Sequence, residues 1–164
     1  MEVRREYRYD ADINKVRLTF GDPEYVRAKY DAQGARNVKI LRCEQTDEIL
    51  DLDVQREVPA EVPGMLKKFL GEWNQVTQIE RWRGTIAAGY QCDMSIEIKG
   101  VPVKMKGNMT LRPDGEGTKV LVLIDIDSKV PLVGSKLAEF VSFTVKQTVK
   151  QEFTFLEHYL GEIA

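Results

Sequence analysis

The spacing of the apolar residues changes for good after Pro131 in this chain of 164 residues. Before this proline, apolar residues mostly alternate with polar ones, as in β-strands that bury one face. After it, they recur at intervals of three or four from Leu137 to Leu160, as in an amphipathic helix. A helix over residues 134–160 would be about 40 Å long, and strands of about 11 residues reach nearly the same length. The sequence therefore predicts a sheet with one long C-terminal helix that lies along it.

Seven segments of the chain are predicted to be strands. The alternation is most regular over residues 85–98, where apolar residues stand at the even positions from Ile86 to Ile98. Short turns between neighbouring segments, such as the one at Gly100, favour an antiparallel sheet. The predicted strands are residues 2–9, 37–44, 48–57, 73–82, 85–98, 101–111 and 118–128.

Short helices are predicted at two places between the strands. Asp10 is expected to cap a helix that follows the first strand. Asp22 and Pro23 are expected to open a second one, because aspartate accepts hydrogen bonds from free backbone N–H groups and proline is tolerated in the first turn. One-turn spacing of the apolar residues over 65–70 predicts a further short helix that ends at Gly71.

This order of elements resembles the START-like (SRPBCC) superfamily, which includes the polyketide cyclases and the birch-pollen-allergen-like proteins. The resemblance covers essentially the whole chain, and it is closest to an uncharacterised bacterial family of START-like proteins. Two segments also look similar to that family. One is Pro63–Gly71, before a strand that ends near Trp82, and the other is KVPLVGSK over residues 129–136, before the last helix.

The resemblance implies an α+β helix-grip fold. In this fold a seven-stranded curved antiparallel sheet surrounds a long C-terminal helix, with two short helices after the first strand. Residues 1–164 would then form a single START-like domain. The superfamily usually encloses an apolar cavity between sheet and helix, so the resemblance also implies a site for a hydrophobic small molecule or lipid.

Apolar and aromatic residues on neighbouring strands and on the last helix are the candidates for lining such a cavity. Unbranched methionine side chains adapt to irregular apolar shapes, and a tyrosine adds a hydroxyl that orients a ligand. The alternative is that the same residues pack a solid core. The candidates are Trp82, Ala88, Tyr90, Met94, Met105, Met109, Leu137, Phe140 and Val141.

Three polar residues are candidates for groups inside the cavity. Gln78 and Glu80 share a face of their strand with Trp82, so Glu80 would either bind a ligand head group, pair with an arginine or lie at a solvated rim. Arg5 shares a face of the first strand with Val3. Its guanidinium would reach a carboxylate ligand at the cavity mouth, form an internal ion pair, or extend to water.

The charge balance and the terminal segment bear on partners and location. Lys and Arg total 24 against 26 for Asp and Glu, a net charge of −2. A nucleic-acid-binding domain would carry a basic excess, as would a protein that docks on an anionic membrane. No apolar run is long enough to span a membrane, and the first residues lack the apolar core of a signal peptide. We therefore expect a cytoplasmic protein with no nucleic-acid partner and no integral membrane association.

The residues that usually carry chemistry are few. The single histidine, His158, lies near the end of the last helix, where packing or exposure explains it better than catalysis. Cys43 and Cys92 are predicted to be buried reduced thiols, with one disulfide between them as the alternative. No motif with metal-ligand spacing and no phosphate-binding glycine loop is present. We therefore predict no catalytic residue, no metal and no cofactor.

Three classes of function are consistent with these features. We favour a carrier or sensor that binds a hydrophobic small molecule or lipid without converting it. The first alternative is a cyclase- or aromatase-like enzyme of the polyketide type, whose chemistry would use tyrosine, arginine or carboxylate groups in the cavity. The second is a protein-interaction module that docks through the long helix or a sheet edge; the sequence does not identify its protein partner.

Overall fold

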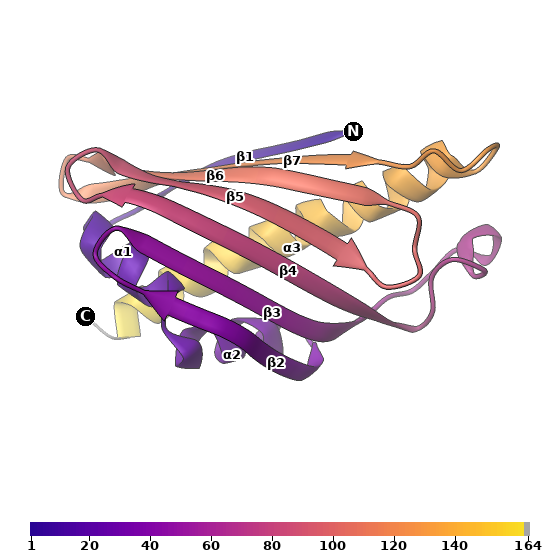
Figure 1. The fold of residues 1–164 in the computed structure, drawn as a ribbon, viewed down its shortest axis with the longest axis horizontal. Helices are drawn as coiled ribbons and strands as arrows, with labels where there is room; N and C mark the ends of the chain where they lie inside the picture. The colour runs from indigo at the N-terminus through magenta and orange to yellow at the C-terminus, as the bar shows by residue number, and fades with distance from the viewer. Residues whose placement is uncertain (163–164) are drawn as a thin grey trace.

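Strands and helices follow one another in the predicted order within residues 1–162, the part of the chain that the computed structural model describes (Figure 1). The strands are β1 (Glu2–Tyr9), β2 (Arg36–Gln45), β3 (Ile49–Pro59), β4 (Trp73–Thr85), β5 (Gly89–Ile98), β6 (Lys104–Asp114) and β7 (Gly117–Asp127). The helices are α1 (Ile13–Phe20), α2 (Pro23–Ala32), the single 3-10 turn η1 (Gly64–Leu66) and α3 (Gly134–Glu162).

The strands form one antiparallel sheet in the order β1-β7-β6-β5-β4-β3-β2. From β2 to β7 each strand pairs with the next along the chain, and β1 completes the sheet by pairing with β7. All three α-helices lie on the same side of this curved, open sheet, and α3 runs along the sheet behind the strands (Figure 1). The predicted α+β helix-grip fold is confirmed.

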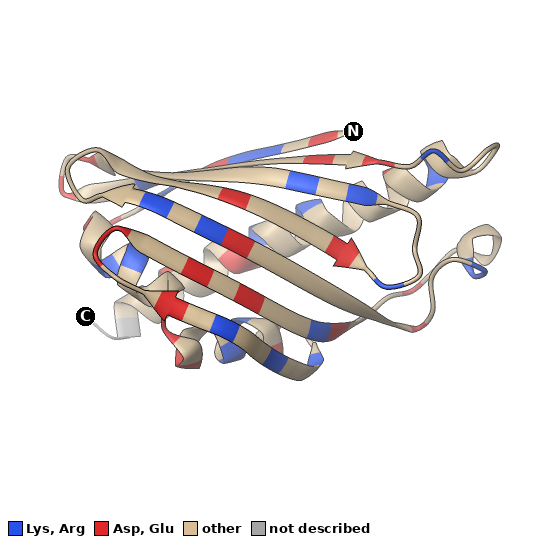
Figure 2. Cartoon of the chain, in the orientation of Figure 1, with Lys and Arg blue, Asp and Glu red and all other residues tan. Residues whose placement is uncertain are grey.

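The two faces of the sheet differ in chemistry because side chains alternate along each strand. On β3, Leu50, Leu52 and Val54 are buried beneath the helices. Acidic and basic residues occur along almost every strand (Figure 2), and on β3 Asp51 and Asp53 alternate with these buried residues and pair with arginines of β4 on the opposite face. The core therefore lies between the sheet and the helices, and the other face is polar.

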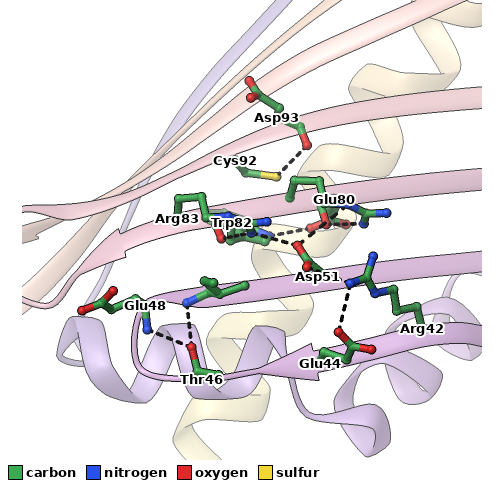
Figure 3. A network of polar contacts seen from close by, with 12 residues as sticks. Arg42, Glu44, Thr46, Glu48, Asp51, Glu80, Trp82, Arg83, Cys92 and Asp93 are labelled. Atoms are coloured by element: carbon green, nitrogen blue, oxygen red, sulfur yellow. Dashed lines mark hydrogen bonds and ion pairs between the residues drawn. The ribbon is translucent and has the colours of Figure 1, made fainter.

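Asp51 is the centre of the charged network on the outer face (Figure 3). One of its carboxylate oxygens accepts a hydrogen bond of 2.8 Å from Arg83, and Arg42 and Arg81 approach to 3.2 and 3.8 Å. The hydrogen bond from Arg83, together with the nearby positive charges, holds the pKa of Asp51 below its ordinary value. These ion pairs link β2, β3 and β4 across the outer face.

The start of α1 differs from the prediction, whereas the start of α2 agrees with it. The cap of α1 is Asp12, whose carboxylate accepts a hydrogen bond of 2.9 Å from the backbone N–H of Lys15. Asp10, the expected cap, instead binds Arg8 at the surface. Asp22 caps α2 as predicted, by accepting a 3.0 Å bond from the backbone N–H of Glu24.

Two further predictions about the elements are wrong. Residues 86–88 form the turn of a hairpin, so β4 extends to Thr85 and β5 starts only at Gly89. Gly89 has φ +91°, and a Cβ there would lie 2.5 Å from the carbonyl oxygen of Leu111, so this position requires glycine. The helix expected over 65–70 is only the short turn η1.

Candidate functional site

A cavity of about 150 Å³ lies between the inner face of the sheet and α3. Its wall is formed by inward-facing side chains of β1 and of β3 to β7, together with residues of α1, α2 and α3. Most of these side chains are aliphatic or aromatic, and the aromatic ones include Phe20, Tyr25 and Phe153. The ring of Phe20 stacks on Trp82, with 5.5 Å between the ring centres, which ties α1 to the sheet at the cavity wall.

Eight of the twelve predicted site residues lie in the wall of this cavity. The sheet register explains why, since Glu80 pairs with Met94, and Ile96 pairs with Met105, so the inward positions of adjacent strands stand side by side. The predicted residues of α3 lie on the side of the helix that faces these strands. The eight residues are Gln78, Glu80, Trp82, Met94, Met105, Met109, Phe140 and Val141.

The other four predicted residues lie outside the cavity wall, beginning with Ala88 and Arg5. Ala88 is exposed in the β4–β5 turn, because the chain has already left the sheet there. Arg5 is exposed on β1, and its Nη1 donates a 2.8 Å hydrogen bond to the backbone oxygen of Arg4. Of the alternatives for Arg5, the structure therefore supports extension to water.

Tyr90 and Leu137 are buried, but neither lies in the wall of this cavity. The hydroxyl of Tyr90 donates a 2.6 Å hydrogen bond to the backbone oxygen of Asp47, and Arg17 lies over its ring. Leu137 is completely buried one turn nearer the start of α3 than Phe140.

Glu80 is buried in the cavity wall, and the expectation of a solvated rim position is wrong. Only 6% of its surface is exposed. Its Oε1 accepts a 2.9 Å hydrogen bond from Nε1 of Trp82 (Figure 3). Its Oε2 accepts one of 2.9 Å from Nε2 of Gln78. The Oε1 of Gln78 in turn accepts a 3.1 Å bond from Nη2 of Arg56. A chain of hydrogen bonds thus runs along the wall through β3 and β4.

Arg56 and Lys29 are polar members of the cavity wall that sequence reasoning missed. Arg56 stands at the position on β3 that continues the inward face of Leu52 and Val54. Lys29 lies on the buried side of α2, next to Tyr30. In both cases the available signal was a cation that interrupts an otherwise apolar face.

Lys29 has an acidic partner on α3. Its Nζ lies 4.0 Å from Oε1 of Glu152, which also accepts a 3.0 Å hydrogen bond from Nε2 of Gln33. Burial, the largest single influence, disfavours the charged form of Lys29, but Glu152 together with Tyr30, Tyr25 and Glu80 outweighs it and raises the pKa of the lysine above its ordinary value. This pair joins α2 to α3 at the cavity wall.

The remaining candidates for chemistry lie away from the cavity. His158 is exposed on α3. Cys43 and Cys92 are both free thiols, and burial raises the pKa of Cys92. Over residues 1–162, no three histidine, cysteine or acidic side chains gather as a set of metal ligands. No helix in this part of the chain is both long and apolar enough to cross a membrane.

The fold is shared with solved structures of low sequence identity. A protein from Thermus thermophilus, TTHA0849, is 16% identical over 100% of this chain and 99% of its own, with a TM-score of 0.71. A fragment of a STAR-related lipid transfer protein from Xanthomonas axonopodis is 18% identical over 97% of this chain and 85% of its own, with a TM-score of 0.66. A START superfamily protein from Mycobacterium smegmatis is 16% identical, covering 99% of both chains, with a TM-score of 0.59.

These similarities show that the chain shares its fold with a START superfamily protein and a STAR-related lipid transfer protein, as the order of elements predicts. No curated protein matches the chain. The family model described as "Protein of unknown function (DUF2505)" matches residues 4–160, which is almost the whole chain. The protein therefore belongs to the DUF2505 family.

Proposed function

We propose that this protein binds a hydrophobic small molecule or a lipid chain in the cavity between the sheet and α3. The observation that carries the proposal is the cavity itself, whose wall is mainly apolar and whose volume is about 150 Å³. The similarity in fold between this protein and a STAR-related lipid transfer protein is in keeping with this function.

The volume of the cavity limits the size of the ligand that it binds without rearrangement of its wall. An engineered cavity of about 150 Å³ in another protein binds benzene, whereas pockets for drug-sized ligands are about 300–1,000 Å³. The space therefore suits a small aromatic molecule or part of an acyl chain. Met94, Met105 and Met109 line it, and their unbranched side chains change rotamer to accept a longer ligand.

Uptake of uncharged apolar probes tests this function. N-phenyl-1-naphthylamine is followed by its fluorescence, and the smaller toluene by NMR. The variant Val145→Phe adds a ring to a cavity-lining residue of α3. If the ring excludes about 55 Å² of ligand surface, affinity falls about tenfold, because that area is worth about 1.4 kcal/mol.

The matched control is Gln147→Phe, which adds the same ring to an exposed position of α3. We expect this variant to bind both probes as the parent does. The proposal would be wrong if the parent took up neither probe, or if the two variants bound equally well.

A further inference from the structure

Arg56 is a buried cation in the cavity wall whose hydrogen-bonding capacity is mostly unused. Only 6% of its surface is exposed. Its Nη2 donates to Gln78 over 3.1 Å, but Nε and Nη1 are buried without any hydrogen-bond partner. Since Nε carries one N–H and Nη1 carries two, three donors are left unpaired.

The positive charge of Arg56 also lacks an acidic partner. Within residues 1–161, no carboxylate comes within 4.0 Å of its guanidinium, although Lys29 in the same wall has Glu152 at 4.0 Å. Glu80 is the acidic residue of the same hydrogen-bond chain, but the side chain of Gln78 lies between the two, and both oxygens of Glu80 already accept bonds from Gln78 and Trp82. Buried arginines are normally paired and fully hydrogen-bonded.

An aromatic ring compensates for only part of the free-energy cost of burying this unpaired cation. The Cζ of Arg56 lies 4.0 Å from the centre of the Tyr30 ring. A ring face attracts the positive charge, but it does not accept the in-plane N–H bonds of the guanidinium. The unpaired donors therefore remain available to an anionic oxygen inside the cavity.

We propose that Arg56 binds the carboxylate of an amphipathic ligand whose apolar part fills the cavity. This inference rests on the proposed function, and it names the chemical class of the ligand. A carboxylate supplies oxygen acceptors for the free N–H donors and one negative charge to oppose one guanidinium. The apolar wall then takes an alkyl chain or an aromatic ring.

Two matched pairs of probes separate the head group from the apolar part: octanoate with 1-octanol, and benzoate with benzyl alcohol. Binding is measured by calorimetry at pH 7.5, where both acids are ionised. Hydrogen bonds to charged groups strengthen binding by about tenfold to a hundredfold. We expect the parent to bind at least one carboxylate about tenfold more tightly than its matched alcohol.

The variant Arg56→Met retains a long side chain but has no donors and no charge. We expect it to lose that preference, with carboxylate affinity reduced about tenfold and alcohol affinity changed less than about threefold. The control Arg83→Met removes an arginine from the outer face, where its side chain is 52% exposed. It should leave the preference for carboxylates intact.

The results distinguish the two proposals. Equal affinity for carboxylates and alcohols in the parent, or a preference that survives in Arg56→Met, would overturn the role of Arg56 while leaving the cavity as an apolar site. Failure of the parent to bind any of these probes, N-phenyl-1-naphthylamine or toluene would overturn both proposals. If Arg56→Met does not fold, the same affinities are measured for Arg56→Gln, which also removes the charge. The role of Arg56 is then judged from whether the parent prefers carboxylates to alcohols and whether Arg56→Gln loses that preference.

Discussion

The ring of Tyr30 joins two cations from different elements: Cζ of Arg56 on β3 lies 4.0 Å from its centre, and Nζ of Lys29 on α2 lies 4.5 Å from it. All three side chains are at least nine-tenths buried. A desolvated cation near an aromatic face is stabilised by about 2 kcal/mol. The ring therefore links α2 to the sheet at the polar part of the cavity wall.

The hydroxyl of Tyr30 is expected to contribute nothing to stability, because it is buried without a hydrogen-bond partner. Tyr30→Phe keeps the ring and removes the unsatisfied group. We expect the free energy of unfolding, measured in urea, to stay unchanged or to rise by up to about 1 kcal/mol. Tyr90→Phe is the control, because the Tyr90 hydroxyl donates to Asp47 over 2.6 Å, and its loss should cost about 1 kcal/mol. A similar loss in both variants would contradict the prediction.

Leu137 is expected to stabilise the packing of α3 even though it lies outside the cavity. Its side chain is completely buried, whereas that of Leu132, in the segment before α3, is completely exposed. Leu137→Ala should lower the free energy of unfolding by about 2–5 kcal/mol, and Leu132→Ala should change it by less than about 0.5 kcal/mol. Chemical denaturation of the two variants compares the same substitution in two environments. Equal effects would show that the start of α3 does not pack as described.

Ionised Asp51 stabilises the fold, so the free energy of unfolding is expected to depend on pH in the acidic range. Its pKa in the folded state is lowered, chiefly by the hydrogen bond from Arg83, so the unfolded chain binds a proton more readily than the folded one. The resulting stabilisation is complete above the ordinary pKa of about 3.9 and is lost as the pH falls through the lower folded-state value. We expect Asp51→Asn to be less stable than the parent at pH 7, and the difference to shrink below about pH 4.

Urea denaturation of both proteins between pH 7 and pH 3 measures this effect. Asp125→Asn is the control, because Asp125 lies exposed on the same sheet, on β7. A difference between parent and Asp51→Asn that stayed constant over this range would mean that the ionisation of Asp51 does not stabilise the fold.

Apolar spacing was enough to predict the order of the strands and helices and, where the alternation is regular, the residues that share one face of a strand. Strand and helix periods are properties of the local backbone, so the change of spacing after Pro131 marks the start of α3 without any knowledge of packing. The same reasoning placed Gln78, Glu80 and Trp82 on one face of their strand, and the structure shows that this face of β4 is the inner one. Once the face is known, the neighbours on β5 follow from antiparallel pairing.

Local spacing was misleading where the backbone leaves the sheet. The alternation that includes Ile86 and Ala88 continues into β5, but these residues form a turn, because Gly89 allows a backbone conformation that other residues avoid. The cap of α1 was misplaced for a related reason, since Asp10 and Asp12 are both suitable and only the path of the chain selects Asp12.

The sequence by itself determined the elements, their order and the apolar inner face of the sheet, because these depend on contacts between residues close in the chain or paired across hairpins. Only the tertiary structure decided which polar groups meet at the cavity. Lys29 and Tyr30 come from α2, Arg56 from β3 and Glu152 from α3, and their distances depend on how two helices pack against one sheet. No periodicity encodes that packing, because it is set by the fit of side chains far apart in the sequence.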